Sequence, residues 1–184
     1  MTDVEHKVVD SQTIYDGKVV TLRIDEIVLD NGDTKHREIV THAPCIVIVP
    51  YFEKEGNFLM IEQFRDPVRK SLWEFPAGMV KGNETPEITA NRELQEETGY
   101  VAKKLDIIGQ YYTSPGFTDE LHHLCLARDL VQKYNQIQDT NEVSRMFKVS
   151  RKTLFEKIKQ GEILDGKTIL AYYWTQSFLS KYAR

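Results

Sequence analysis

The stretch of sequence that decides the fold runs from Gly78 to Tyr100 and reads GMVKGNETPEITANRELQEETGY. Its second part predicts a helix with clearly marked ends. Thr85 has the side chain of an N-cap, Pro86 suits the first helical position, and Glu87 favours the positive end of the helix dipole. Gly99 supplies the left-handed residue that commonly ends a helix. We therefore expect a helix between Pro86 and Gly99, entered from a loop that contains two glycines.

Three glutamates crowd one side of this predicted helix. Glu93, Glu96 and Glu97 stand at positions i, i+3 and i+4, which brings their carboxylates to the same face. Like charges at this spacing repel one another, and a divalent cation would relieve the repulsion. Oxygen donors in this number suit Mg²⁺, with Mn²⁺ as a substitute. The alternative interpretation is an ordinary solvated acidic face, which a glutamate cluster standing alone would favour.

The spacing of the residues around the glutamates decides between these two interpretations. Glu84 follows Gly78 after five residues, and the pair Arg92-Glu93 follows Glu84 after seven more. The run then continues with an aliphatic residue, two further glutamates, a glycine and the apolar Tyr100. This pattern matches the Nudix box at every defined position, and the chain resembles the Nudix hydrolase superfamily. The resemblance favours the metal site over the solvated face.

The resemblance implies a role for each residue of the box. In related pyrophosphatases, box glutamates and one main-chain carbonyl hold the divalent metal ions. The matching residues in this chain are Ala77, Glu93, Glu96 and Glu97. Arg92 is expected to pair with Glu84 and so to fix the loop to the helix, which orients the metal ligands. Ile88, Ala90 and Leu94 are expected to face the core.

Extended segments dominate the chain before the box. Residues 7–42 predict three strands with a hairpin signal at Asn31-Gly32-Asp33, and residues 45–78 predict three apolar strands, the last being SLWEFPAG. Because hairpins prevail early while strands and helices interleave later, we expect mixed sheets flanked by helices. The fold class is α/β, or α+β, and the resemblance implies a Nudix α/β/α sandwich. Residues 1–42 form the predicted N-terminal antiparallel β subdomain, and residues 43–184 form the predicted Nudix hydrolase domain.

The last third of the chain predicts two helices. Ser150 is placed to cap the segment RKTLFEKIKQG, and a final helix runs from about Lys167 to Tyr182. Asp165 or one of its neighbours is expected to cap that final helix, since aspartate is a favoured N-cap residue.

Residues outside the box resemble one branch of the superfamily, the pyrophosphatases of ADP-ribose and other nucleoside diphosphate sugars. The resemblance rests on the stretches KHREIV, EQFR followed by LWEFPAG, and SPGFTDE. By analogy, Arg65 would contact the diphosphate, while Arg37 and Glu38 would lie near the nucleoside. Glu120 would accept hydrogen bonds from sugar hydroxyls, and Phe117 would stack on a base or a sugar. The alternative interpretation makes Arg37 and Arg65 ordinary surface arginines.

The segment DTNEV around Glu142 resembles an acidic loop that carries a catalytic glutamate in this branch. Glu142 is therefore the predicted general base, which takes a proton from the attacking water. Glu96 and Arg92 complete the predicted catalytic set. Relatives usually show another acidic residue shortly afterwards, where this chain has Arg145. If Glu142 is not the base, the next candidates are Glu120 and a glutamate of the box.

The box and the branch together predict a hydrolase that splits the diphosphate of a nucleoside diphosphate sugar with the help of Mg²⁺. ADP-ribose is the first expected substrate, giving AMP and ribose 5-phosphate. GDP-mannose hydrolysis, or broad specificity for nucleoside diphosphate sugars, is the alternative within this class. An alternative of another class is a non-catalytic Nudix module that senses nucleotides, although such sensors usually have a damaged box or an attached DNA-binding domain.

Composition indicates which kinds of partner to expect. The 184 residues carry a net charge of −4 without a basic run, which argues against a nucleic-acid partner. We expect a cytoplasmic protein without a membrane partner, because neither a signal peptide nor a membrane helix is predicted. Cys45 and Cys125 lie in apolar runs and are expected to be inert core residues. A homodimer through the N-terminal strands is expected, because a small antiparallel unit cannot hide both of its faces alone.

Overall fold

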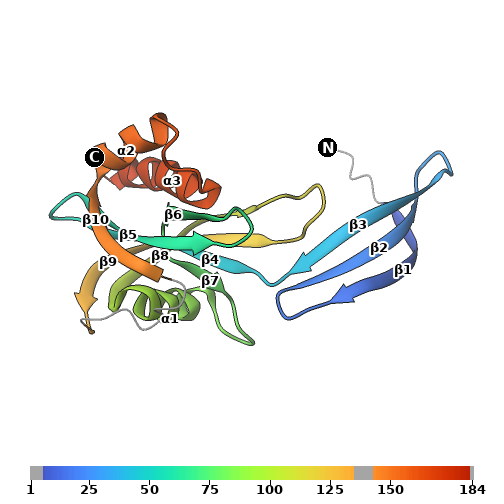
Figure 1. Cartoon of the computed structure of the whole chain (residues 1–184), viewed down its shortest axis with the longest axis horizontal. Coiled ribbons are helices and arrows are strands. Elements are labelled where there is room, and N and C mark those ends of the chain that lie inside the picture. The colour runs from blue at the N-terminus through green and yellow to red at the C-terminus, as the bar shows by residue number, and fades with distance from the viewer. Residues whose placement is uncertain (1–5, 135–142, 183–184) are drawn as a thin grey trace. The chain divides into compact units, whose positions relative to one another are not determined.

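The computed structural model describes residues 6–134 and 143–182. The chain divides into two compact units, each built on its own sheet (Figure 1). Unit 1 comprises Met1–Pro44 and Tyr112–Leu121, and unit 2 comprises Cys45–Tyr111 and His122–Arg184.

Unit 1 is based on a three-stranded antiparallel sheet in the order β1-β2-β3. Its strands are β1 (Lys7–Asp16), β2 (Val20–Val28) and β3 (Thr34–His42). The predicted hairpin signal lies at the turn between β2 and β3, where Gly32 has a φ of 84° and its N–H donates to Leu29 O at 2.8 Å. A positive φ of this kind favours glycine, which explains the residue at the tip of the turn.

A loop from unit 1's second segment is hydrogen-bonded to β3. The N–H of Val40 donates to Phe117 O at 2.8 Å, and the N–H of Asp119 donates to Val40 O at 3.4 Å. The carboxylate of Asp119 also accepts a hydrogen bond from the N–H of His42 at 2.9 Å. The loop that contains two predicted substrate contacts, Phe117 and Glu120, is therefore fixed along β3, the strand that carries Arg37 and Glu38.

Unit 2 contains a mixed sheet of seven strands. Its main path has the order β10-β5-β4-β9-β8, β6 pairs with β5, and β7 pairs with β4. The pair β4 and β9 is parallel, whereas β5 is antiparallel to β4, β6 and β10. The strands are β4 (Cys45–Phe52), β5 (Asn57–Arg65), β6 (Lys70–Glu74), β7 (Ala77–Met79), β8 (Tyr100–Tyr112), β9 (Leu121–Gln132) and β10 (Val143–Ser150).

The stretch SLWEFPAG forms parts of two strands, and the prediction of a single strand was wrong. The chain leaves β6 after Glu74 and enters β7 at Ala77, so that it changes its partner from β5 to β4. Pro76 has no N–H to give to a sheet, and its carbonyl accepts a hydrogen bond from the N–H of Ile48 at 2.8 Å. The change of partner brings Ala77 and Gly78 directly before the loop that leads to the box helix.

Three helices cover the two faces of this sheet, namely α1 (Pro86–Thr98), α2 (Arg151–Lys159) and α3 (Gly166–Tyr182). Side chains of β4 alternate between two cores. Val47 and Val49 belong to the core that includes α2 and α3, whereas Ile46 and Ile48 belong to the core that includes α1. Figure 1 shows α1 on one side of the sheet and α2 with α3 on the other. The expected α/β/α sandwich of mixed strands is confirmed.

Helix α1 has the predicted bounds and caps. The hydroxyl of Thr85 accepts a hydrogen bond from the N–H of Ile88, and Gly99 adopts a left-handed φ of 73°. Ala90 and Leu94 are fully buried, but Ile88 is 56% exposed, so its predicted place in the core was wrong. Two helical positions separate Ile88 from Ala90, which is about 200° of rotation, so the two side chains leave opposite sides of the helix.

Other local predictions were confirmed. The hydroxyl of Ser150 caps α2 by accepting a hydrogen bond from the N–H of Thr153 at 3.0 Å, and Asp165 Oδ2 caps α3 through the N–H of Thr168 at 2.9 Å. Cys45 and Cys125 are buried, and they form no disulfide in the described part of the chain. Burial raises the pKa of the Cys125 thiol to about 12, so that it stays protonated and unreactive at neutral pH.

Candidate active site

Arg92 joins the loop before α1 to the helix itself. Its Nε and Nη2 donate to the two carboxylate oxygens of Glu84 at 2.9 Å each, and Nη2 also donates to Met79 O at 3.1 Å. Its Nη1 donates to Glu93 Oε1 at 2.5 Å and to Glu96 Oε2 at 3.2 Å. The predicted pairing of Arg92 with Glu84 is confirmed, and the same guanidinium holds two of the three clustered glutamates.

These contacts keep Glu84 ionised. Hydrogen bonds from Arg92 and from the hydroxyl of Thr89, the latter at 2.8 Å, lower the pKa of Glu84 to about 2. In return, the hydrogen bond with Glu84 raises the pKa of Arg92. The pair therefore keeps both charges over the whole range of pH in which an enzyme is assayed.

Glu93 and Glu97 are nearly buried carboxylates, with 8% and 5% of their surface exposed. Burial raises the pKa of Glu93, and Arg92 opposes that effect. Glu97 Oε2 accepts a hydrogen bond from the N–H of Ala77 at 3.3 Å. A Cβ atom on Gly78 would overlap the carboxylate of Glu93, so a larger residue there would displace that carboxylate. The main chain at Ala77 and Gly78 thus lies against both carboxylates.

These residues fit a divalent cation. A buried carboxylate needs a compensating positive charge, and Glu93 shares the guanidinium of Arg92 with two other glutamates. Glu96, whose side chain is 39% exposed, offers a third oxygen donor on the same helix. Carboxylates together with a neighbouring main-chain carbonyl are the donor set that Mg²⁺ and Mn²⁺ prefer.

Arg65, at the end of β5, is not an ordinary surface arginine. Its Nε and Nη2 donate to the two carboxylate oxygens of Glu74 at 2.9 and 2.6 Å. This hydrogen-bonded pair raises the pKa of Arg65, with smaller contributions from the charges of Asp165 and Glu97. Arg65 therefore lies within electrostatic reach of Glu97, one of the predicted metal ligands.

Sequence reasoning did not single out Glu74 or Lys167, which join Arg65 in one charged cluster. Glu74 is fully buried, and its Oε2 also accepts a hydrogen bond from Lys167 Nζ. The only signal in the sequence was a glutamate inside the apolar strand SLWEF, because a charged residue at a buried position requires a partner. Nothing in the sequence identified that partner.

Three predicted substrate contacts meet in unit 1. Arg37 and Glu38 of β3 and Phe117 of the neighbouring loop line a cavity of about 550 Å³. The ring of Phe117 is 56% exposed and is free to contact a ligand. Glu120 does not line this cavity; its Oε2 accepts a hydrogen bond from the hydroxyl of Thr113 at 2.8 Å.

Glu142, the predicted general base, lies outside the residues that the structure describes. Arg145, at which the resemblance predicts a departure from relatives, lies on β10. It forms an ion pair with Glu62 at 2.6 Å, and its guanidinium lies 5.9 Å from the ring centre of Trp73 and 5.1 Å from that of Phe147. Arg145 is thus held on the surface of the sheet by strand β5 and by two aromatic rings.

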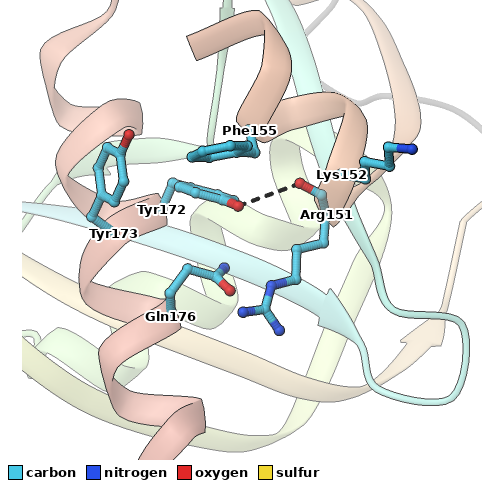
Figure 2. A pocket seen from close by; sticks show the side chains of 6 residues that line it. All are labelled: Arg151, Lys152, Phe155, Tyr172, Tyr173 and Gln176. Atoms are coloured by element: carbon cyan, nitrogen blue, oxygen red, sulfur yellow. Dashed lines mark hydrogen bonds between the residues drawn. The ribbon is translucent and has the colours of Figure 1, made fainter. Parts of the chain in front are cut away.

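A further cavity of unit 2, of about 600 Å³, lies between α2 and α3 and contains no predicted site residue. Figure 2 shows the ring of Phe155 above the ring of Tyr172, whose hydroxyl donates to Arg151 O at 3.3 Å. The residues that line this cavity are Arg151, Lys152, Phe155, Tyr172, Tyr173 and Gln176. They come from two helices, and no motif in the sequence connects them.

Comparison with known proteins places these features in a family. The NUDIX domain family matches residues 41–170. The chain is 38% identical to the ADP-ribose pyrophosphatase of Bacillus subtilis over 96% of this chain and 95% of the relative. It is 37% identical to the methanol dehydrogenase activator of Bacillus methanolicus over 94% of this chain and 93% of the relative.

A solved structure described as an ADP compounds hydrolase has the same fold. It matches with a TM-score of 0.88 over the whole of both chains, at 16% sequence identity. At so low an identity the likeness concerns the fold alone. Among the helices in the described parts of the chain, none has the length and apolar character needed to cross a membrane.

Proposed function

The chain belongs to the Nudix family of pyrophosphohydrolases, and from this premise we propose that it hydrolyses nucleoside diphosphate sugars with Mg²⁺, with ADP-ribose as its preferred substrate. The observation that carries the proposal is the pair of buried carboxylates, Glu93 and Glu97, that lie against the main chain at Ala77 and Gly78. The choice of ADP-ribose is supported by the name of the Bacillus subtilis relative, which aligns along nearly its whole length.

In the proposed reaction, water attacks one phosphorus of the diphosphate. The bond from that phosphorus to the bridging oxygen breaks, and the products are AMP and ribose 5-phosphate. Glu93, Glu96, Glu97 and the carbonyl of Ala77 would hold Mg²⁺, which would supply positive charge to stabilise the transition state and to lower the pKa of the water. Arg92 keeps Glu93 and Glu96 in place through its hydrogen bonds.

Glu142 accepts the proton of the attacking water in this proposal. Its replacement by Gln should lower kcat by about 10²- to 10⁴-fold, the usual contribution of a general base. Glu120→Gln is the matched variant, because Glu120 is the next candidate for the base. If Glu142→Gln keeps the wild-type kcat while Glu120→Gln loses it, then Glu120 takes the role of the base.

Arg65 is proposed to bind the diphosphate. Arg37, Glu38 and Phe117 are proposed to contact the nucleoside, which is supported by their place around one cavity of unit 1. An aromatic ring, a guanidinium and a carboxylate suit a base with its ribose hydroxyls. Glu120 is proposed to accept hydrogen bonds from the sugar. Arg37→Ala and Phe117→Ala should each raise KM for ADP-ribose more than they lower kcat.

The test of the function is a panel of nucleoside diphosphate sugars and dinucleoside polyphosphates assayed with Mg²⁺, with the products identified by mass. AMP and ribose 5-phosphate from ADP-ribose, formed with Mg²⁺ and not with EDTA, are the expected result. If kcat/KM is higher for GDP-mannose than for ADP-ribose, GDP-mannose is the preferred substrate. If kcat/KM is equal for several nucleoside diphosphate sugars, the specificity is broad. A reaction in H₂¹⁸O would show which phosphorus is attacked. A chain that binds these compounds without turnover would be a nucleotide sensor.

A second candidate function is activation of a dehydrogenase. It is favoured by one observation, the name of the Bacillus methanolicus relative. Adding the purified chain to a methanol dehydrogenase assay tests this candidate. If the wild-type chain raises the dehydrogenase rate and Glu97→Gln does not, activation depends on the hydrolytic site. No change in the rate with either protein removes the candidate.

Homodimer formation through residues 1–42, the N-terminal part of unit 1, is also proposed. Every residue of β1 is exposed, and apolar side chains such as Val8, Ile14 and Tyr15 are about half exposed. Exposed apolar residues gathered on one small sheet are typical of an interaction surface. Gel filtration of the full chain should show a dimer, and removal of residues 1–42 should give an inactive monomer. An active truncated monomer would contradict the proposal.

A further inference from the structure

The carboxylate of Glu74 is shared by two cations from distant parts of unit 2. The guanidinium of Arg65 on β5 approaches it edge-on with two hydrogen bonds, and Lys167 Nζ of α3 donates to Oε2. The side chain of Glu74 is 1% exposed, whereas the side chain of Arg65 is 36% exposed. Exposure thus increases from the shared carboxylate toward the guanidinium, which is the end of the cluster that a ligand can reach.

Helix α3 is fixed to β6 at the residues around Glu74. The hydroxyl of Thr168 accepts a hydrogen bond from the N–H of Phe75 at 2.9 Å, directly after Glu74. Lys167 Nζ also donates to Asp165 Oδ1 at 2.8 Å, and Asp165 caps the helix through the N–H of Thr168. The ammonium of Lys167 is therefore held from both sides and has little freedom to leave Glu74.

A buried ion pair is seldom explained by stability alone, because apolar residues of similar volume often stabilise a protein equally well. The geometry of this cluster instead restricts one guanidinium. Glu74 occupies the Nε and Nη2 edge of Arg65, and Nη1 has no hydrogen-bond partner among residues 6–134 and 143–182. The charge of Glu97 acts on Arg65, so the guanidinium lies within electrostatic reach of one of the predicted metal ligands. A fixed and directed donor is what binding of a diphosphate requires.

We propose that Lys167 is a positioning residue for the substrate diphosphate, acting on Arg65 through the carboxylate that both cations share. This proposal rests on the proposed binding of the diphosphate by Arg65. Lys167 neutralises part of the charge of Glu74 and holds its carboxylate in one orientation, and that orientation sets the direction of the guanidinium. The lowered pKa of Glu74, which persists although burial alone would raise it, agrees with a carboxylate kept ionised by both cations.

The test combines Lys167→Met, Lys167→Arg and Arg65→Ala, alone and in pairs, with ADP-ribose and saturating Mg²⁺. Lys167→Met should raise KM about tenfold with kcat within about threefold of wild type, as expected for a weakened charge-assisted hydrogen bond. In Lys167→Arg, KM should stay close to the wild-type value. In the Arg65→Ala background, Lys167→Met should have almost no further effect, because the two residues act in series.

The matched control is Lys148→Met, which removes a lysine that pairs with the exposed Glu55 on the same sheet and should leave KM unchanged. Thermal unfolding shows whether each variant is folded, and Lys167→Gln replaces Lys167→Met if the latter is not. An unchanged KM in folded Lys167→Met overturns the proposal, as does an equal loss in the presence and absence of Arg65.

The proposed function can fail separately. If the wild-type chain does not hydrolyse ADP-ribose, the same variants are compared by calorimetry for the binding of ADP with Mg²⁺. Binding weakened about tenfold by Lys167→Met and restored by Lys167→Arg would support the positioning role without the reaction. Equal binding by all variants would overturn it.

Discussion

Arg92 and Arg65 each hold glutamates, but they draw their partners from different distances along the chain. The carboxylates around Arg92 belong to Glu84, Glu93 and Glu96, which are at most eight residues away from it. Arg65 reaches Glu74 across one pair of strands, and the second cation on Glu74 comes from a residue 93 positions further along. One cluster is thus assembled by a loop and its helix, and the other by the tertiary fold.

The two clusters also differ in their contact with water. Glu84 and the side chain of Arg92 are about one-fifth exposed, whereas the carboxylate of Glu74 is inaccessible. Water can replace a lost partner in the first cluster but not in the second. Changes around Arg92 should therefore affect catalysis more than folding, and changes at Glu74 should affect folding as well.

The largest effect is expected from Glu97→Gln, which removes the charge of a proposed metal ligand and keeps the shape of the side chain. The value of kcat/KM for ADP-ribose should fall by about 10³-fold or more, since metal stabilisation of the transition state is worth several kcal/mol. Glu87→Gln is the matched control, because Glu87 is an exposed glutamate in the first turn of the same helix. Equal activity of the two variants would show that Glu97 does not bind the metal.

Glu74→Gln is expected to have the next largest effect, and it acts on stability. It leaves Arg65 and Lys167 without their shared counter-charge, so the free energy of unfolding should fall by about 3 kcal/mol, as for a broken buried ion pair. Urea denaturation measures this change. Glu55→Gln, which breaks the exposed pair with Lys148, should leave the denaturation midpoint unchanged. If both variants lose the same free energy of unfolding, the burial of Glu74 does not increase its contribution to stability.

The pairing of Arg92 with Glu84 could be predicted because the chain resembles the Nudix box, in which the matching residues pair. The other contacts of Arg92, with Glu93 and Glu96, join residues that are close along the same helix. The second cluster could not be predicted, since no spacing rule connects Glu74 with Lys167. Tertiary context also explains the errors: Pro76 ends one strand and lets the chain join another, and Ile88 points away from the sheet that buries Leu94.

The titration of Glu84 tests how strongly Arg92 lowers the pKa of this carboxyl group. The folded pKa of about 2 lies below the ordinary value of 4.5, so the contribution of this pair to stability is present at neutral pH. It is lost as the pH falls from 4.5 toward 2. Carboxyl-detected NMR should show the low midpoint in the wild type and a rise toward 4.5 in Arg92→Lys, because lysine cannot make the two-point contact. An unchanged midpoint in the variant would assign the shift to Thr89 instead.

The smallest effect is expected at Arg145, the residue that departs from the pattern of relatives. Its side chain is 58% exposed, and its partners are Glu62 and the rings of Trp73 and Phe147. An exposed ion pair contributes up to about 1 kcal/mol and exposed cation–π contacts about 0.5–1 kcal/mol, so Arg145→Ala should lower stability by about 2 kcal/mol or less. Since these partners lie on β5, β6 and β10 and none belongs to the box cluster, kcat/KM should stay within about twofold of wild type.

Arg145→Glu tests the same position with the opposite charge. It introduces the acidic residue that is expected in relatives and places it next to Glu62. If the departure from relatives has no catalytic meaning, this variant should lose some stability through repulsion and keep its kcat/KM. A clear gain in kcat for Arg145→Glu would instead mean that an acidic residue after Glu142 takes part in the reaction. The surface role of Arg145 would then have replaced a catalytic one.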